Sequence, residues 1–217
     1  MIKTLIIIFS IFFSNLTLAM DSSLHEQNIS KDVKDIIDPP GVAALNIMVS
    51  TLSSLKELKK QNKDSKENVE ALIRIKLLPN LATDVAAKIA LDQHWDGLNI
   101  QQRQFFQHYI SESLIQDYIG MLASYEKLDS VQIFVDPNIR RKDNKAIVKL
   151  NISINSDSKP FSITLKLIRL NSWNVYDVVF SGVSIVKNYQ AQFNSYIKRK
   201  GVDALIERSK NKLEKLK

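Results

Sequence analysis

The chain has 217 residues, with 30 basic residues against 23 acidic residues and a formal net charge of +7. This length supports one domain, or at most two small ones. The absence of cysteine excludes disulfides, thiolate catalysis, iron–sulfur clusters and cysteine-ligated zinc. The few glycine and proline residues, with ordinary apolar content, exclude collagen-like, low-complexity and disordered chains.

The first residues predict an export signal. Lys3 precedes an apolar run from Leu5 to Phe13, and Ala19 supplies a small residue at a cleavage position. This is the pattern of a secretory signal peptide, and the run is shorter than the ~20 residues that a membrane-spanning helix needs. We therefore expect residues 1–19 to be a cleaved signal peptide, residues 20–40 a polar leader, and residues 41–217 a single exported domain.

Apolar residues then recur at helical spacing. From Val42 an amphipathic helix is expected, with Leu45, Val49, Leu52, Leu55 and Leu58 recurring every three or four residues. Asp64 or Ser65 can cap a second helix that stops before Pro79, and Asn99 with Gln102 can form a reciprocal cap for a long helix reaching about residue 125. Further helices are expected at 85–91, 183–200 and 203–216. Gly201 can end the helix at 183–200 in a left-handed backbone conformation.

Between the long helix and the last two helices the apolar period changes from 3.6 to 2, which indicates half-buried strands. Strands are expected at 131–135, 148–154, 161–167 and 173–180. Short, turn-rich links between them favour antiparallel neighbours. Helices, then strands, then helices predict an α+β domain with helices packed on one face of a curved antiparallel sheet of about four strands.

No group of residues predicts a catalytic or metal centre. His25, His94 and His108 lack the spacing of a helical metal site, and Gly182-Val183-Ser184 lacks the second glycine of a nucleophile elbow. Asp177 is the most unusual carboxylate, because it lies inside an apolar strand. It could be a catalytic acid with a raised pKa, but a structural hydrogen-bond acceptor or helix cap is the favoured interpretation.

Two stretches are more specific. One runs from Leu77-Leu78-Pro79 through Trp95 and Gln101-Gln102-Arg103-Gln104-Phe105-Phe106 to Tyr118. The other holds Trp173-Asn174-Val175-Tyr176-Asp177-Val178, Ser181-Gly182-Val183-Ser184, Gln192-Phe193 and Lys200-Gly201-Val202-Asp203. Together they resemble the MlaC, or toluene-tolerance auxiliary, family. Asn80 and Asp92 depart from the family pattern.

The resemblance implies a carrier without enzymatic activity, catalytic residues, metal or cofactor. Such proteins look like soluble periplasmic shuttles of Gram-negative bacteria that carry one phospholipid as cargo and help to maintain the lipid asymmetry of the outer membrane. The implied partners are an outer-membrane lipoprotein–porin complex and an inner-membrane ABC transporter with an MCE-domain subunit. Nucleic acid is not expected as a partner.

By the same resemblance the acyl tails lie in an apolar cavity between sheet and helices. We expect its lining among the inward strand faces and the long helix. The candidates are Phe106, Ile110, Leu114, Tyr118, Met121, Val148, Leu150, Ile152, Ile163, Leu165, Leu167 and Val175. For each of them, ordinary core packing is the competing interpretation.

Two other functions stay open at this point. One is an exported enzyme on a similar α+β fold, with Asp177 and a tyrosine as an acid–base pair. The other is a chaperone or adaptor whose apolar groove receives protein segments. The basic charge is compatible with anionic headgroups or with acidic patches on partners.

Overall fold

The computed structural model describes residues 39–123, 130–154 and 160–215, with the side chains of the longest helix described as far as Gln116. These residues belong to one compact unit, Pro39–Lys217, whereas the expected signal peptide and nearly all of the leader lie outside the described residues. The helices are α2 (Pro40–Lys60), α3 (Lys66–Lys76), η1 (Leu78–Asn80), α4 (Thr83–Leu91), η2 (Asp92–Gly97), α5 (Ile100–Ala123), α6 (Ile185–Lys200) and α7 (Val202–Glu214). The strands are β1 (Gln132–Val135), β2 (Arg140–Lys142), β3 (Lys145–Ser153), β4 (Phe161–Arg169), β5 (Trp173–Phe180) and β6 (Val183–Ser184).

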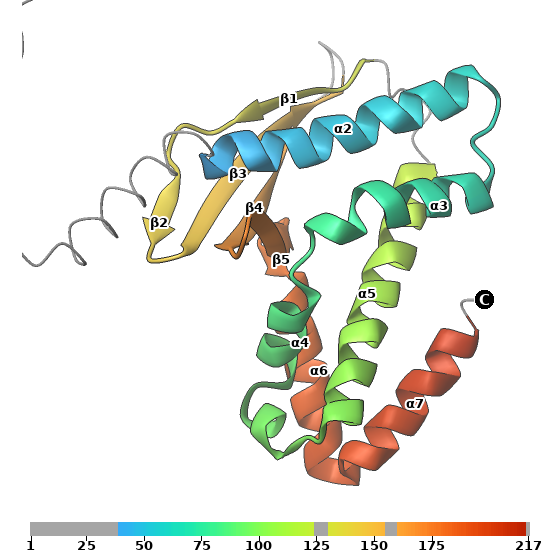
Figure 1. Ribbon diagram of the computed structural model, residues 1–217, viewed down its shortest axis with the longest axis vertical. Coiled ribbons are helices and arrows are strands. Elements are labelled where there is room, and N and C mark those ends of the chain that lie inside the picture. The colour runs from blue at the N-terminus through green and yellow to red at the C-terminus, as the bar shows by residue number, and fades with distance from the viewer. Residues whose placement is uncertain (1–38, 124–129, 155–159, 216–217) are drawn as a thin grey trace, which may run out of the picture. The chain divides into compact units, whose positions relative to one another are not determined.

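The strands form one antiparallel sheet in the order β1-β3-β4-β5-β6, with β2 also paired to β3 (Figure 1). The four expected strands are confirmed as β1, β3, β4 and β5. The short strands β2 and β6 were not expected. Each pairs over only two or three residues, and neither carries the apolar alternation that reveals a strand in sequence.

Alternate residues of the three long strands point into the core. Val148 pairs with Leu165 and Leu150 with Ile163, and all four are buried. Their sequence neighbours on β3 and β4, such as Lys149 and Thr164, are exposed or half-buried on the other face. The sheet therefore has one apolar face and one polar face, as the alternation predicted.

A β-bulge in β5 changes which face its side chains occupy. Leu167 pairs with Val175, but the preceding residue of β4, Lys166, pairs with Asp177, so Tyr176 is the extra residue of β5. Paired residues share a face of a sheet. Val175 therefore points to the apolar face with Leu167, whereas Asp177 points to the polar face with Lys166.

Helix caps follow the sequence closely. Ser65 accepts a hydrogen bond from the Asn68 amide at the start of α3. At the start of α5, the Asn99 amide donates to Gln102 Oε1 at 3.1 Å and the Gln102 amide donates to Asn99 Oδ1 at 2.9 Å, which is the reciprocal cap that the sequence predicted. Gly201 ends α6 with φ of +84°, a backbone region that favours glycine.

The amphipathic helix predicted from Val42 is confirmed as α2, with Leu55 fully buried and Leu52 packed against the core, but its buried face also includes residues outside the predicted stripe. Its buried residues include Gly41, Ala44 and Ile47, whereas Val49 is 44% exposed. The reason is close approach to the sheet: a Cβ added at Gly41 would lie 2.8 Å from Ile139 Cδ1. Small residues such as Gly41 and Ala44 allow one face of α2 to approach the strands closely. The spacing of large apolar residues does not reveal such a face.

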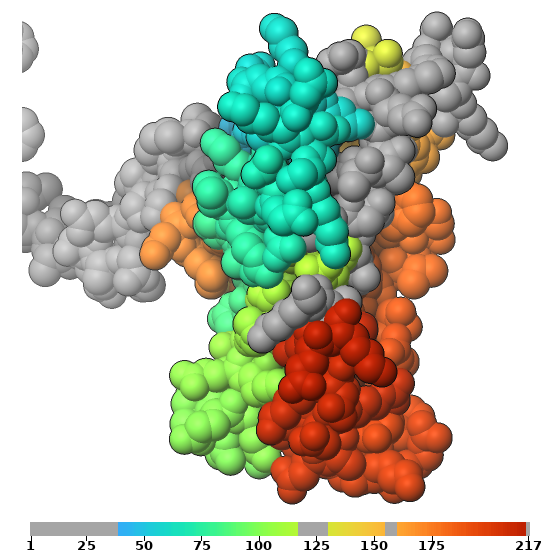
Figure 2. All heavy atoms as spheres, turned by 90° about the vertical axis from the view of Figure 1, so that its right-hand side faces the viewer, coloured from blue at the N-terminus to red at the C-terminus, as the bar shows by residue number. Residues whose placement is uncertain are grey.

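The core consists of two clusters of buried apolar residues. The sheet-side cluster joins α2 and α3 to the inward faces of β3, β4 and β5, and the helix-side cluster joins α4, η2, α5, α6 and α7. Helix α5 contributes to both, with Ile115 in the sheet-side cluster and Ile110 in the helix-side cluster. Figure 1 shows α2 lying across the sheet and α4, α5, α6 and α7 grouped together. In Figure 2, α7 lies against the first part of α5, with α3 above.

Candidate functional site

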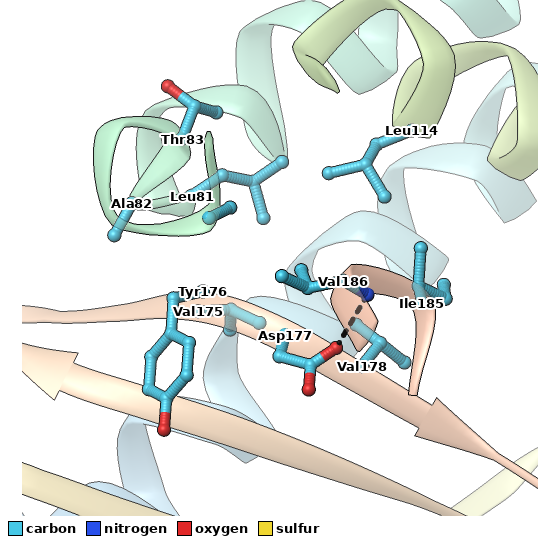
Figure 3. Close-up of a pocket in the computed structure, with 11 residues that line it drawn as sticks. Leu81, Ala82, Thr83, Leu114, Val175, Tyr176, Asp177, Val178, Ile185 and Val186 are labelled. Atoms are coloured by element: carbon cyan, nitrogen blue, oxygen red, sulfur yellow. Dashed lines mark hydrogen bonds between the residues drawn. The ribbon is translucent and has the colours of Figure 1, made fainter. Parts of the chain in front are cut away.

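A small apolar pocket lies where the two clusters meet (Figure 3). Its walls come from the residues that begin α4, from α5, from the bulged part of β5 and from the first residues of α6. The lining residues are Leu81, Ala82, Thr83, Ala86, Leu114, Val175, Tyr176, Asp177, Val178, Ile185 and Val186. The pocket thus takes side chains from the sheet, from the helix-side cluster and from the segments that connect them.

The strand and helix that form this pocket are joined directly to each other. Leu81 forms a parallel bridge to Val175, and the Ala82 amide donates to the Val175 carbonyl at 2.8 Å. This contact covers part of the outer edge of β5. It also brings the small residues Ala82 and Ala86, at the beginning of α4, over the strand.

Polar groups line only part of the pocket. Tyr176 is half-buried, and Figure 3 shows its ring directed away from Leu81 and Leu114. Burial raises the pKa of Tyr176; the positive charge of Lys166 opposes this rise and the negative charge of Asp177 adds to it. The hydroxyl therefore stays protonated at neutral pH. Leu81, Leu114, Val178 and Ile185 present apolar groups to the pocket.

Asp177 ties β5 to the start of α6. Its carboxylate Oδ1 accepts a hydrogen bond from the Val186 amide at 3.1 Å, and Oδ2 accepts one from the Ser184 hydroxyl at 2.7 Å. Lys166 Nζ lies 2.8 Å from Oδ2, and Asp177 is 4% exposed. The Ser184 hydroxyl oxygen in turn accepts from the Lys187 amide. Asp177 is therefore an acceptor for the first turn of α6, which confirms the structural interpretation.

A second polar contact joins the two clusters through α3 and α5. Arg74 Nη1 and Nη2 donate to the two carboxylate oxygens of Glu112 at 2.7 and 2.6 Å, and Arg74 also donates to Glu70 on its own helix. These carboxylates raise the pKa of Arg74 above its usual value, with Glu112 as the larger cause. A two-pronged guanidinium–carboxylate pair is among the stronger hydrogen-bonded arrangements and fixes direction as well as distance.

The predicted lining residues divide between the pocket and the two clusters. Leu114 and Val175 line the pocket. Phe106 and Ile110 lie in the helix-side cluster. Val148, Leu150, Ile152, Ile163, Leu165 and Leu167 lie in the sheet-side cluster. The side chains of Tyr118 and Met121 lie outside the described residues. Contact of these residues with lipid stays a prediction.

Sequence reasoning missed most of the wall formed by α4 and α6. Ala86, Ile185 and Val186 line the pocket, but none was a candidate. The available signal was the run of small residues Ala86, Ala87 and Ala90 on one helix, because alanine permits close approach between a helix and its neighbours. The structure shows all three alanines buried in the helix-side cluster.

Other suspected chemical groups have ordinary surroundings. His94 Nε2 lies 3.1 Å from Asn194 Oδ1 on α6, and the side chain of His108 is largely exposed. Gly182 occupies a turn with φ of +81°, and Ser184 is the cap of α6 rather than a nucleophile. Across the described ranges, no group of acidic or histidine side chains is arranged to hold a metal ion. His25 lies outside them.

The pocket is small for a lipid. The space between its lining atoms admits about one water molecule. Ligand pockets usually measure about 300–1,000 Å³, and the two acyl chains of a phospholipid together carry roughly 30 methylenes. The two clusters are packed together around this pocket.

Within the described part of the chain, no helix combines the length and hydrophobicity needed to cross a membrane. Comparison with known families gives a match between residues 46–211 and the family described as MlaC protein. A relative, the intermembrane phospholipid transport system binding protein MlaC of Haemophilus influenzae, is 25% identical over 142 residues. That match spans 64% of this chain and 65% of the relative's length.

Among solved structures, the fold is similar to that of a phospholipid-binding protein from Ralstonia solanacearum, determined in complex with a phospholipid. The TM-score is 0.70 at 23% sequence identity, and the superposition covers 81% of this chain and 97% of the other. The α+β fold with helices on a curved antiparallel sheet is thereby confirmed.

Proposed function

The chain belongs to the MlaC family, and from this membership and the pocket we propose that it is a phospholipid carrier that moves lipid between membranes. The observation that carries the proposal is the apolar pocket at the junction of the two core clusters. The role requires a sheltered apolar space and no chemical reaction, which fits a pocket whose buried carboxylate is fully engaged in holding α6.

Lipid tails enter this protein by separating the helix-side cluster from the sheet-side cluster, while the headgroup stays in water. Burying a methylene contributes about 0.8 kcal/mol, so roughly 30 methylenes give a gross gain that exceeds the practical affinity ceiling of about 18–21 kcal/mol. The relevant comparison is with a bilayer, where the tails are already away from water. A carrier needs an interior that matches the bilayer approximately, so that lipid can be accepted and released.

The pocket offers such an interior because its walls belong to different elements. Leu114 comes from α5, Val175 and Val178 from β5, and Ala86 from α4. These elements pack against one another without a covalent cross-link, since the chain has no cysteine. Separating them exposes apolar surface that acyl tails then cover.

Native mass spectrometry of the exported protein, followed by analysis of its organic extract, tests the proposal. We expect one diacyl phospholipid per chain. Leu114→Arg places a charge in the pocket and should remove most of the bound lipid. Ile100→Arg is the matched control, because it makes a similar change on the same helix at a side chain that is 61% exposed, and it should retain the lipid.

If Leu114→Arg does not fold, Ala86→Leu provides a second test, because it narrows the pocket from the opposite wall without adding charge. Far-UV circular dichroism of each variant shows whether it is folded. An empty wild-type protein that also takes no lipid from vesicles would contradict the proposal. Equal lipid content in folded Leu114→Arg and Ile100→Arg would contradict the assignment of the pocket.

The place of action and the partners are part of the same proposal. Residues 1–19 direct export to the periplasm of a Gram-negative bacterium and are cleaved there, and the mature protein exchanges lipid with an outer-membrane lipoprotein–porin complex and an inner-membrane ABC transporter bearing an MCE-domain subunit. Support comes from the apolar run that begins at Leu5 and from family membership. The intact mass of the periplasmic protein tests the first part; a chain retaining residues 1–19 contradicts it.

A further inference from the structure

One end of the sheet carries a concentrated group of basic side chains. It is formed by the β2–β3 turn with its flanking residues and by the β4–β5 turn. Residues 140–145 and 169–172, here named the hairpin surface, contain Arg140, Arg141, Lys142, Lys145 and Arg169 against the single carboxylate of Asp143. All but Arg169 are exposed, and Arg169 is half-buried. Figure 1 shows both turns at the same end of the sheet.

Backbone contacts hold the two turns together. The Arg169 amide donates to the Asn144 carbonyl at 2.7 Å, and Asn144 Nδ2 donates to the Arg169 carbonyl at 3.4 Å. Within the β4–β5 turn, the Leu170 amide donates to the Ser172 carbonyl at 3.0 Å. The guanidinium groups of Arg141 and Arg169 lie 5.7 and 5.5 Å from the centre of the Trp173 ring, and Trp173 is 3% exposed. Arg141 and Arg169 therefore pack over the ring of a buried tryptophan beneath the two turns.

A single large apolar side chain projects from this basic surface. Leu170 occupies the β4–β5 turn and is 51% exposed. An aliphatic side chain at a turn, surrounded by lysine and arginine, suits the boundary between lipid headgroups and acyl chains, where the apolar group enters and the cations meet phosphates. Lysine and arginine can also extend their charged ends toward the headgroups from a short distance.

The hairpin surface suits a membrane better than a protein partner. A stable protein interface buries about 800 Å² on each side and is enriched in aromatic residues at its centre. Here the aromatic residue, Trp173, is already buried beneath the arginines, and Leu170 is the one large apolar group that the surface exposes. A lipid bilayer does not need a shape complementary to the protein, so its headgroups can rearrange around the tips of the two turns.

The hairpin surface is also connected to the pocket. Lys145 Nζ lies 5.8 Å from the centre of the Tyr176 ring, and Tyr176 lines the pocket.

We propose that the hairpin surface docks this protein on anionic phospholipid membranes, with Leu170 inserted among the headgroups and the surrounding basic residues bound to phosphate. This docking is separate from cargo binding, so it can fail while the proposed carrier function holds.

Co-sedimentation of the exported protein with vesicles tests the docking. We expect binding to vesicles that contain phosphatidylglycerol, little binding to phosphatidylcholine alone, and loss of binding as the ionic strength rises toward 1 M, because the screening length shortens to about 3 Å. Arg140→Gln with Lys142→Gln should weaken binding by about 25-fold, since each basic residue near an anionic surface contributes about a fivefold factor. The matched control is Arg199→Gln with Lys200→Gln, which removes the same charges from the exposed last turn of α6 and should leave binding unchanged.

Insertion of the turn is tested separately. In Leu170→Trp, the added indole should shift its emission to shorter wavelength on anionic vesicles, because the native Trp95 and Trp173 are already buried. Both double variants should still contain phospholipid in native mass spectrometry.

The docking proposal would be overturned by wild-type protein that does not bind anionic vesicles, by equal weakening in the two double variants, or by an unshifted emission in Leu170→Trp. Unchanged vesicle binding in Arg140→Gln with Lys142→Gln would also overturn it, because the membrane contact would then lie elsewhere on the protein. Wild-type protein that does not bind vesicles would leave an acidic protein as the occupant of the hairpin surface to test.

Discussion

Replacing Asp177 by alanine is expected to loosen the attachment of α6 to the sheet. The carboxylate holds three groups: the Val186 amide at 3.1 Å, the Ser184 hydroxyl at 2.7 Å and Lys166 Nζ at 2.8 Å. Its side chain is 3% exposed, so water does not replace it in the folded protein. Alanine leaves all three donors facing the vacated position.

The size of the effect follows from the solvation of those donors. Removing one partner of a buried ion pair costs about 3–5 kcal/mol when the other charge stays buried, and hydrogen bonds to charged groups contribute about 1.5–3 kcal/mol each. The Lys166 side chain is 25% exposed and can regain water, which places the loss near the lower limit, at about 3 kcal/mol. Asp177→Asn keeps one acceptor for the Val186 amide and should cost about 1.5–2 kcal/mol.

Urea unfolding of the wild type and both variants measures these losses. A double-mutant cycle with Lys166→Met isolates the ion pair from the two hydrogen bonds, and a coupling energy of about 1 kcal/mol is expected for a partly solvated pair. Hydrogen exchange gives the local readout: amides in the first turn of α6, including Val186, should exchange faster in Asp177→Asn, whereas amides of β3 should change in proportion to global stability only.

If Asp177→Ala lowered the free energy of unfolding by less than about 1 kcal/mol, this reasoning would be refuted. Removing a buried carboxylate that three donors contact should cost more than that. Unchanged exchange in the first turn of α6 would contradict the local part of it. If Asp177→Asn kept wild-type stability, the structural interpretation of Asp177 would be contradicted, and its role as a catalytic acid would have to be tested.

Three further predictions concern stability. Arg74→Met should lower the free energy of unfolding by about 1 kcal/mol, because it breaks the paired contact with Glu112 while the arginine is partly solvated; urea unfolding measures the loss. Asn99→Ala should cost about 1 kcal/mol by removing the cap of α5, measured in the same way. Burial raises the pKa of Tyr176 above its usual value of 10.0, so the unfolded chain loses its proton first and stability falls as pH rises above about 10; Tyr176→Phe should reduce this alkaline loss in unfolding measured across that range.

Each of these has a result that contradicts it. An exposed arginine such as Arg199, mutated to methionine, should have almost no effect, and an equal loss at both arginines would show that the contact with Glu112 contributes nothing. Asn99→Ala with wild-type stability would mean that the cap is dispensable. Identical alkaline profiles for the wild type and Tyr176→Phe would show that another group governs that range.

The elements and the class of fold follow from local patterns in the sequence. Helix α5 begins where Asn99 and Gln102 can satisfy each other's amides, and β3 alternates because one face of it is buried. These signals need only neighbours in the chain. Short strands such as β2 give no such signal, because three charged residues become a strand only when β3 offers them an edge.

Long-range packing decided the rest. The inward face of α2 depends on how closely Gly41 approaches Ile139, a residue far along the chain. The bulge at Tyr176 turns Asp177 to the polar face, and alternation counted along β5 alone cannot reveal an extra residue opposite β4. The position of Asp177 under α6 is therefore a property of the paired strands.

The sequence by itself determined that the chain has an export-type leader pattern and an α+β order of elements. It also showed many periodic apolar residues and no recognisable group of catalytic residues. It did not determine which apolar residues form a pocket. Leu114 and Leu165 are equally apolar and equally periodic, yet only Leu114 lies where the two clusters meet. Hydrophobic periodicity reports that a side chain is withdrawn from water. The tertiary structure decides whether its neighbour there is a tightly packed side chain or a gap at the junction of two clusters.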